Sequence, residues 1–218
     1  MNENWILSLR VPFTEATRKE NGLSDDNISG LGDVTLSATL QPWSENNSLL
    51  RGLSFSAGLI LPTGEPRDNP QVGSVTAPSV FQLGTGTTQM SVGARYSGQL
   101  DDWSYFSSLN LTFPLYESSK DFRPAETVFF SAGLGRKLTE NLSARLSADF
   151  FHGNRDEFSG SDIANTGSTN LSLTPSFIYS INDDISASVS VAIPIYREVN
   201  QTALAVGPLW SLGLSMRF

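Results

Sequence analysis

The sequence predicts an all-β protein: a transmembrane, antiparallel, up-and-down β-barrel of about ten strands, with long external loops and short periplasmic turns. Three observations support this fold class. Apolar and polar residues alternate in about ten separate stretches, long and short connections alternate between those stretches, and the apolar face carries almost no charge. A soluble barrel would show the reverse arrangement, with large apolar side chains inside and charges outside.

The first five alternating stretches cover residues 5–13, 31–41, 53–61, 89–97 and 103–115. Each places Leu, Val, Ala or an aromatic residue on one face and mainly Ser, Gly, Thr or Asn on the other, as the two-residue period of a strand requires. In the fifth stretch, Trp103 and Leu109 are expected to face outward, whereas Phe106 and Ser108 are expected to face inward.

The other five stretches cover residues 128–137, 142–150, 171–181, 185–193 and 208–218. In the last of them every second residue from Pro208 is apolar, and the sequence ends on Phe218. This pattern resembles the C-terminal signal of bacterial outer-membrane proteins, so Phe218 is expected to be recognised by the outer-membrane assembly machinery. Closure of the barrel would pair this last strand with the first.

The connections between the stretches predict the same topology. Long connections, rich in charge and turn-forming residues, cover residues 14–30, 62–87, 116–126, 152–168 and 196–206, whereas those at 99–102, 138–141 and 181–184 are short. Ten strands with this alternation place both termini on the periplasmic side. The longest connection, 62–87, contains the apolar run TAPSVFQLG and is therefore expected to pack inward or at the rim.

Composition excludes several other classes of protein. The 218 residues are expected to form a single domain, 1–218, and the absence of cysteine excludes disulfides and cysteine metal sites. The net charge of -8 argues against a nucleic-acid partner. No run approaches the ~20 consecutive apolar residues of a transmembrane helix. The sequence predicts no metal site and no cofactor.

The first residues, MNENWILS, lack the basic and apolar regions of a signal peptide. For a protein of the bacterial outer membrane, we therefore expect that a signal peptide was removed and that Met1 was added.

Three runs resemble a known family of outer-membrane proteins. They are GLGDVTLSATL at 30–40, LSFSAGLILPTGE at 53–65 and LGTGTTQMSVGARYS at 83–97. Together they are similar to the transporters of the "MetA pathway of phenol degradation". The resemblance implies a channel-like barrel that admits hydrophobic molecules and accompanies enzymes of aromatic catabolism. It also implies that an additional N-terminal strand pair, giving about twelve strands, is an alternative. It offers no catalytic motif.

Seven charged residues are expected on the inward face, which implies either a wet lumen or an internal network of salt bridges. They are Arg10, Asp33, Arg95, Lys137, Arg145, Asp149 and Arg217. Lys137 and Arg145 flank a short turn, so we expect a cationic constriction there that would attract carboxylates or phenolates. Salt bridges that plug the barrel are the alternative. The many inward Ser, Gly and Thr residues favour open space.

An enzymatic site at His152, the only histidine, is a further interpretation, because Asp149 and Asp156 lie near it in the sequence. The strand period places His152 on the same face as Phe150 and away from Asp149, so a rim histidine without a catalytic role is predicted. An outer-membrane hydrolase or protease that uses His152, and a plugged structural or adhesion barrel, stay as alternatives.

The sequence therefore predicts a passive outer-membrane channel for small, hydrophobic or aromatic molecules, and not an enzyme. The expected partners are outer-membrane lipid and lipopolysaccharide, the assembly machinery and a small-molecule permeant.

Overall fold

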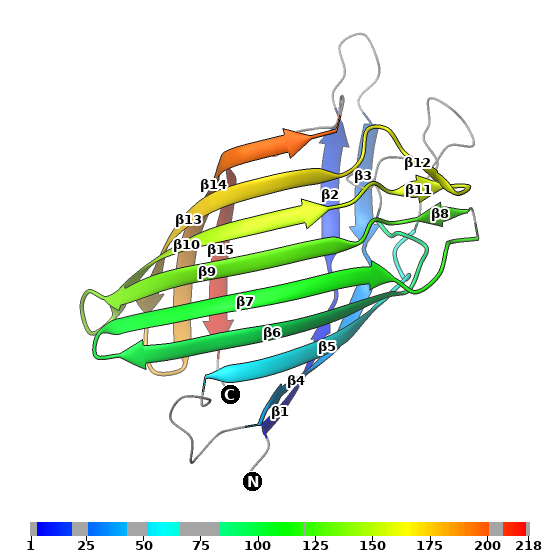
Figure 1. Ribbon diagram of the computed structural model, residues 1–218. Coiled ribbons are helices and arrows are strands. Elements are labelled where there is room, and N and C mark those ends of the chain that lie inside the picture. Colours follow the sequence, from blue (N-terminus) through cyan, green and yellow to red (C-terminus); the bar gives the residue numbers. More distant parts are fainter. Residues whose placement is uncertain are drawn as a thin grey trace.

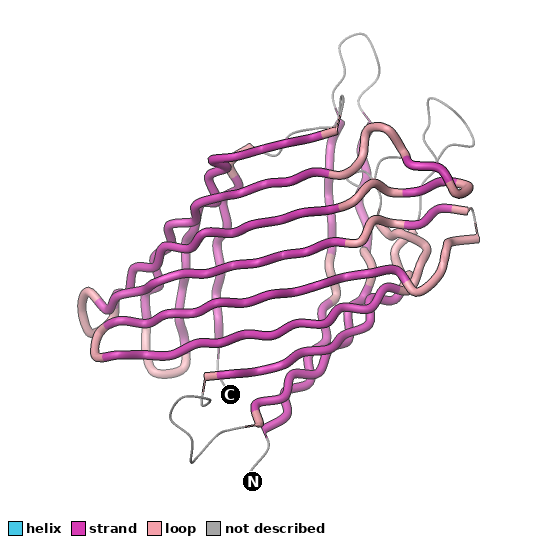
Figure 2. The backbone as a smooth tube through the Cα atoms, in the orientation of Figure 1, coloured by secondary structure: helices cyan, strands magenta, loops and turns pink. Residues whose placement is uncertain are grey.

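The computed structural model describes residues 4–18, 26–42, 52–65, 83–119, 121–200 and 207–216. Within these ranges no helix is long and apolar enough to cross a membrane. The largest unit is a ten-stranded sheet, which Figures 1 and 2 show curling so that its first and last strands lie behind the front wall.

The strands of this sheet are, in spatial order, β1 (Asn4–Arg10), β4 (Val34–Gln41), β5 (Leu53–Leu61), β6 (Gln89–Leu100), β7 (Trp103–Pro114), β9 (Thr127–Lys137), β10 (Leu142–Gly153), β13 (Ser168–Ser180), β14 (Ile185–Val199) and β15 (Leu209–Met216). Every neighbouring pair is antiparallel. The spatial order follows the chain order, so the predicted up-and-down, all-β antiparallel fold is confirmed.

The register confirms the two predicted faces, because directly opposed residues of an antiparallel pair lie on the same face. Phe150 on β10 opposes Phe130 on β9, and Asp149 opposes Ser131. The apolar face is the exposed one: Leu109 is 42% and Leu146 is 53% accessible. An apolar face of this extent is a surface for lipid, because in water it would be a large unsatisfied hydrophobic patch.

The sheet ends at β1 on one side and at β15 on the other. Each of these two strands pairs on one side among the described residues, β1 with β4 and β15 with β14. Their side chains are consequently more exposed than those of the wall: Leu7 is 81% and Leu212 is 86% accessible. The pairing between the last and first strands that the sequence analysis expects is not formed by the described residues.

The termini and turns have the predicted arrangement. Asn4 at the start of β1 opposes Gln41, and Met216 at the end of β15 opposes Ile185, which follows the short 181–184 turn. The ends of the described chain therefore lie on the side of the short turns (Figure 1).

The connection at 14–30, predicted as a loop, contains two paired strands, β2 (Phe13–Arg18) and β3 (Asp26–Leu31). They continue the hairpin of β1 and β4 beyond the barrel wall. Pro12 interrupts the ladder because it has no N–H, and the Gly32 N–H donates to the Pro12 carbonyl at 2.9 Å across the break. The prediction failed because this segment is polar on both faces and shows no alternation.

Two further loop predictions are wrong in the same sense. Segments 116–126 and 152–168 contribute β8 (Phe122–Arg123), β11 (Glu157–Phe158) and β12 (Ser161–Asp162), which form a small sheet in the order β12-β11-β8. We call this unit the rim sheet. It buries Phe122, which is 2% accessible. The pairing joins two loops that are far apart in sequence, so no local sequence pattern predicts it.

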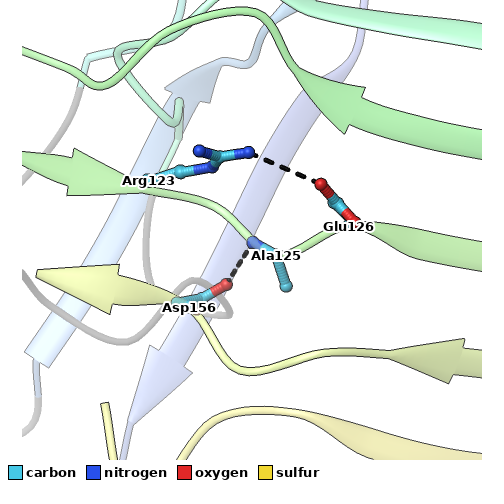
Figure 3. A network of polar contacts seen from close by, with 4 residues as sticks. All are labelled: Arg123, Ala125, Glu126 and Asp156. Carbon is cyan, nitrogen blue, oxygen red and sulfur yellow. Dashed lines mark hydrogen bonds and ion pairs between the residues drawn. The ribbon is translucent and has the colours of Figure 1, made fainter. Parts of the chain in front are cut away.

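Polar contacts join the segments that connect the wall strands to the rim sheet (Figure 3). The Asp156 carboxylate accepts a hydrogen bond from the Ala125 N–H at 2.8 Å, and Arg123 forms an ion pair with Glu126 at 3.4 Å. A tight turn closes β11 and β12, with φ of 49° at Ser159 and 72° at Gly160, a conformation that glycine adopts without strain.

Candidate functional site

The candidate site is the inward face of the wall formed by β6, β7, β9 and β10. On this face β7 presents Ser104, Phe106 and Ser108, and the opposed inward positions of β9 are Gly135, Gly133 and Ser131. Phe106 is thus a large aromatic side chain among small ones. Small residues opposite a large one leave room for its side chain and for long side chains of neighbouring strands.

Gly133 provides the space in which the Phe106 ring lies. A Cβ atom at Gly133 would lie 2.6 Å from Cε1 of Phe106 and 2.8 Å from the Leu146 carbonyl oxygen. Any larger residue at Gly133 would therefore displace the ring. The ring extends across β9 towards β10, where Ser147 opposes Gly133.

Two arginines converge on this ring. The guanidinium carbon of Arg95 on β6 lies 5.0 Å from the centroid of Phe106, and that of Arg145 on β10 lies 5.3 Å from it. Arg95 opposes Ser108 on β7, one inward position to the external side of Phe106. Arg145 opposes Gly135, which opposes Ser104, one inward position to the periplasmic side. Both contacts fall within the range of cation–π interactions.

Neither arginine has an acidic partner. Among the described residues, the ion pair is Arg123–Glu126 in the rim sheet, and Arg95 and Arg145 form none. The nearest inward acid on the same strand as Arg145 is Asp149, four residues or about 13 Å further along. Arg95 is exposed although it faces inward. The alternative arrangement, a network of salt bridges through the lumen, is therefore not formed by these residues.

Asp149 is held by neutral donors instead. Its carboxylate accepts hydrogen bonds from the hydroxyls of Ser131 on β9, Ser147 on β10 at 3.1 Å and Thr174 on β13. Three hydroxyls from three adjacent strands saturate one side of this charge, and they fix the carboxylate against the wall.

Asp33 is held in a second saturated site at the external rim. One carboxylate oxygen accepts the Gly64 N–H at 3.0 Å, and the other accepts the Thr85 N–H at 2.9 Å and the Thr85 hydroxyl at 3.0 Å. Thr63 adds a second link, because its hydroxyl donates to the Gly32 carbonyl at 3.1 Å and accepts the Val34 N–H at 2.9 Å. We call this arrangement the Asp33 clasp.

The clasp brings together the three runs that carry the family resemblance. Gly64 and Gly84 pack backbone to backbone, since a Cβ atom at Gly84 would lie 2.3 Å from the Gly64 carbonyl oxygen. Thr87, at the end of the returning segment, is fully buried. The clasp thus fixes both ends of the 62–87 connection at one place. Residues 66–82, on which the predicted inward packing depends, lie outside the described residues.

Of the other predicted lumen residues, Lys137 lies close to Arg145 across the β9–β10 pair, as the sequence predicts, whereas Arg10 lies on a different part of the sheet. Lys137 opposes Ser143 at the periplasmic end of the wall and is exposed, one inward position beyond Arg145. Arg10 opposes Thr35 on the wall of β1 and β4. Arg217 and Phe218 lie outside the described residues. The cationic constriction stays a prediction; of its expected residues, Arg95 and Arg145 contact the same ring.

Arg136 gives a useful contrast on the outer face. It opposes Trp103 at the periplasmic end of β9, and its guanidinium carbon lies 5.3 Å from the Trp103 ring centroid. A cation at this depth can extend to the membrane surface along the tryptophan.

His152 does not form an acid–base pair with either nearby acid. Its Nδ1 lies 2.9 Å from the Thr169 hydroxyl oxygen, whereas Asp149 binds hydroxyls and Asp156 binds the Ala125 N–H. His152, Asp149 and Asp156, the residues of the alternative hydrolase site, therefore each bind a different partner and not one another.

Sequence reasoning placed Phe106 inward but did not include it among the site residues. The signal was present, because Phe106 is the one aromatic residue on the inward side of the 103–115 stretch. What the sequence could not supply is that arginines from β6 and β10, on either side of it, reach the same ring.

Comparison with known proteins gives two results. The model of the family described as "Putative MetA-pathway of phenol degradation" matches residues 1–208. An outer-membrane channel from Pseudomonas putida F1 has a similar structure, with a TM-score of 0.74 and 14% sequence identity over 97% of this chain and 74% of that one. A search of curated protein sequences gave no match.

Proposed function

The chain belongs to this family of phenol-degradation proteins, and on that premise we propose that it is a passive outer-membrane channel for small hydrophobic or aromatic molecules. The observation that carries the proposal is the contrast between the two faces of one sheet. The outer face is apolar and exposed, whereas the inner face is rich in small polar residues and carries Arg95, which is exposed and forms no ion pair among the described residues. Lipid suits the first face, and water or a permeant suits the second.

The same contacts favour a channel over the alternatives. A barrel plugged by salt bridges would need inward acids and bases in contact, and Asp149 binds hydroxyls while Arg95 and Arg145 contact Phe106. An enzyme would need an activated nucleophile or base, and His152 is bonded to Thr169. We propose accordingly that the protein is not an enzyme and that its partners are outer-membrane lipid, lipopolysaccharide, the assembly machinery and the permeant.

Planar-bilayer recording of the detergent-refolded protein tests the proposal. We expect discrete conductance steps with a preference for anions, because Arg95 and Arg145 face the lumen and form no ion pair among the described residues. Replacing Arg95 or Arg145 with Ser should lower the anion-to-cation permeability ratio by roughly twofold or more. A protein that inserts as a heat-modifiable barrel and conducts no current would contradict the channel function.

A further inference from the structure

We propose that Arg95, Phe106 and Arg145 form a binding site for small aromatic carboxylates within the lumen. This inference rests on the proposed channel function for its biological use, but the site itself follows from the contacts of these three side chains.

The first argument is the supply of hydrogen-bond donors. Each guanidinium stands about 5 Å from the Phe106 centroid, which uses its charge but leaves the N–H groups at its edge uncommitted. Arginine presents these donors as a planar fork that matches the two oxygens of a carboxylate. Two such forks from β6 and β10 approach one ring from opposite sides along the barrel axis.

The second argument is charge. Two cations beside the same ring repel one another unless an anion lies between or near them. The described acids that face inward do not serve this purpose: Asp33 is saturated by Gly64 and Thr85, and Asp149 by three hydroxyls. An anion from solution is therefore the partner that these two arginines lack.

The third argument concerns the ring, and it selects an aromatic anion over a small inorganic one. Phe106 faces the lumen over Gly133, and its partly exposed ring offers an edge or face for an aromatic pair. Phe129 and Phe151 also face inward, directly opposed on β9 and β10 towards the external end of the same wall. An aromatic molecule that enters from outside would thus meet aromatic side chains both before and at the arginines.

Fluorobenzoate is a suitable probe, because fluorine NMR reports its binding to the refolded protein in detergent without requiring conduction. We expect saturable binding that Arg95→Gln and Arg145→Gln each weaken by roughly tenfold or more, the usual consequence of losing a charged hydrogen-bond donor. Arg95→Lys, which keeps the charge and loses the fork, should fall between Arg95→Gln and the parent protein.

Arg136→Gln is the matched control. It removes a guanidinium that stacks on an aromatic ring at the same 5.3 Å as Arg145 does, but on the outer face. Its effect on fluorobenzoate binding should stay within about twofold. An equal loss in Arg136→Gln and Arg145→Gln would overturn the site, because it would reveal a general effect of charge or of stability.

Phe106→Leu tests the aromatic part. It should reduce the advantage of fluorobenzoate over fluoroacetate and leave fluoroacetate binding within about twofold of the parent value. If the parent protein binds both anions equally, the site is a general anion site and the aromatic assignment is wrong.

The two proposals fail in different experiments. A protein that binds fluorobenzoate through Arg95 and Arg145 but conducts no current keeps the site and loses the channel. A protein that conducts, with no fluorobenzoate binding or with binding indifferent to both arginines, keeps the channel and loses the site.

Discussion

The predicted inward charges of the wall and of the external rim are of two kinds, and the two kinds have different partners. The acids Asp33 and Asp149 each accept three hydrogen bonds from neutral groups of the wall or the rim. The arginines Arg95 and Arg145 contact a single aromatic ring and, within the described part of the chain, no acid. Opposite charges within one lumen could have neutralised each other, but Arg145 lies four residues from Asp149 along β10, and β7 and β9 lie between Arg95 and Asp149.

This difference separates charges that hold the structure from charges that are available to a ligand. A carboxylate with every oxygen occupied ties strands or loops together, and its removal leaves donors without acceptors. A guanidinium with free donors contributes little to the wall, and its removal costs the protein little. Replacing one of the acids should therefore lower the stability of the fold more than ligand binding. Replacing one of the arginines should lower ligand binding more than stability.

The largest effect should come from Asp33→Ala, which leaves the Gly64 and Thr85 N–H groups without an acceptor in a closely packed part of the rim. We expect the free energy of unfolding to fall by about 2–4 kcal/mol, because two backbone donors lose a charged partner at once. Urea titration in lipid vesicles, followed by tryptophan fluorescence, measures this change.

Glu65→Ala provides the control for Asp33→Ala. It removes an acid of the same connection that is exposed and for which the structure shows no hydrogen bond, so the change should stay within about 0.5 kcal/mol. A similar loss in both variants would show that net charge, rather than the clasp, governs stability.

A smaller loss, about 1–3 kcal/mol, is expected for Asp149→Ala, because the hydroxyls of Ser131, Ser147 and Thr174 can turn to one another or to water. Fluorobenzoate binding should not weaken in this variant. Arg145→Gln on the same strand should show the reverse: weakened binding with a stability change within about 0.5 kcal/mol. If Arg145→Gln destabilises the barrel as much as Asp149→Ala does, the distinction between the two kinds of charge fails.

The faces of the wall could be predicted from the sequence, because a period of two needs only local information. The two-residue period places Arg95, Arg145 and Asp149 on the inward face and His152 on the face away from Asp149. The observed register agrees with this placement. The family resemblance likewise identified the three runs of the clasp. It could not say that Asp33 is the residue on which they meet.

The parts of the fold and of the candidate site that could not be predicted depend on contacts between segments that are distant in sequence. Two loops pair to make the rim sheet, and three strands bring Arg95, Phe106 and Arg145 together. Both arise from register across several strands, which alternation within one strand does not encode. The hairpin of β2 and β3 was missed because the residues of this segment do not alternate between apolar and polar, so there is no period of two to detect.

The smallest effect on stability is expected at Asp156, which is a third kind of charge. Its carboxyl group is buried beside the rim sheet and accepts a hydrogen bond from one neutral donor, the Ala125 N–H. Burial raises the pKa of its carboxyl above the usual 3.8, and the hydrogen bond from Ala125 only partly offsets this. The folded protein therefore binds the proton more tightly than the unfolded chain does. The stability of the rim sheet should be greatest below the unfolded pKa and should fall as pH rises through the raised one.

Asp156→Asn should remove this dependence, since the amide keeps an oxygen for the Ala125 N–H and carries no charge to desolvate. Hydrogen exchange of residues 122–126, corrected for the intrinsic rate between about pH 4 and about pH 7, should show protection that declines with pH in the parent and stays level in the variant. Protection that rises with pH in the parent would mean that the Ala125 hydrogen bond outweighs burial. Asp156 would then belong with Asp33 and Asp149 as an acid whose ionised form stabilises the fold.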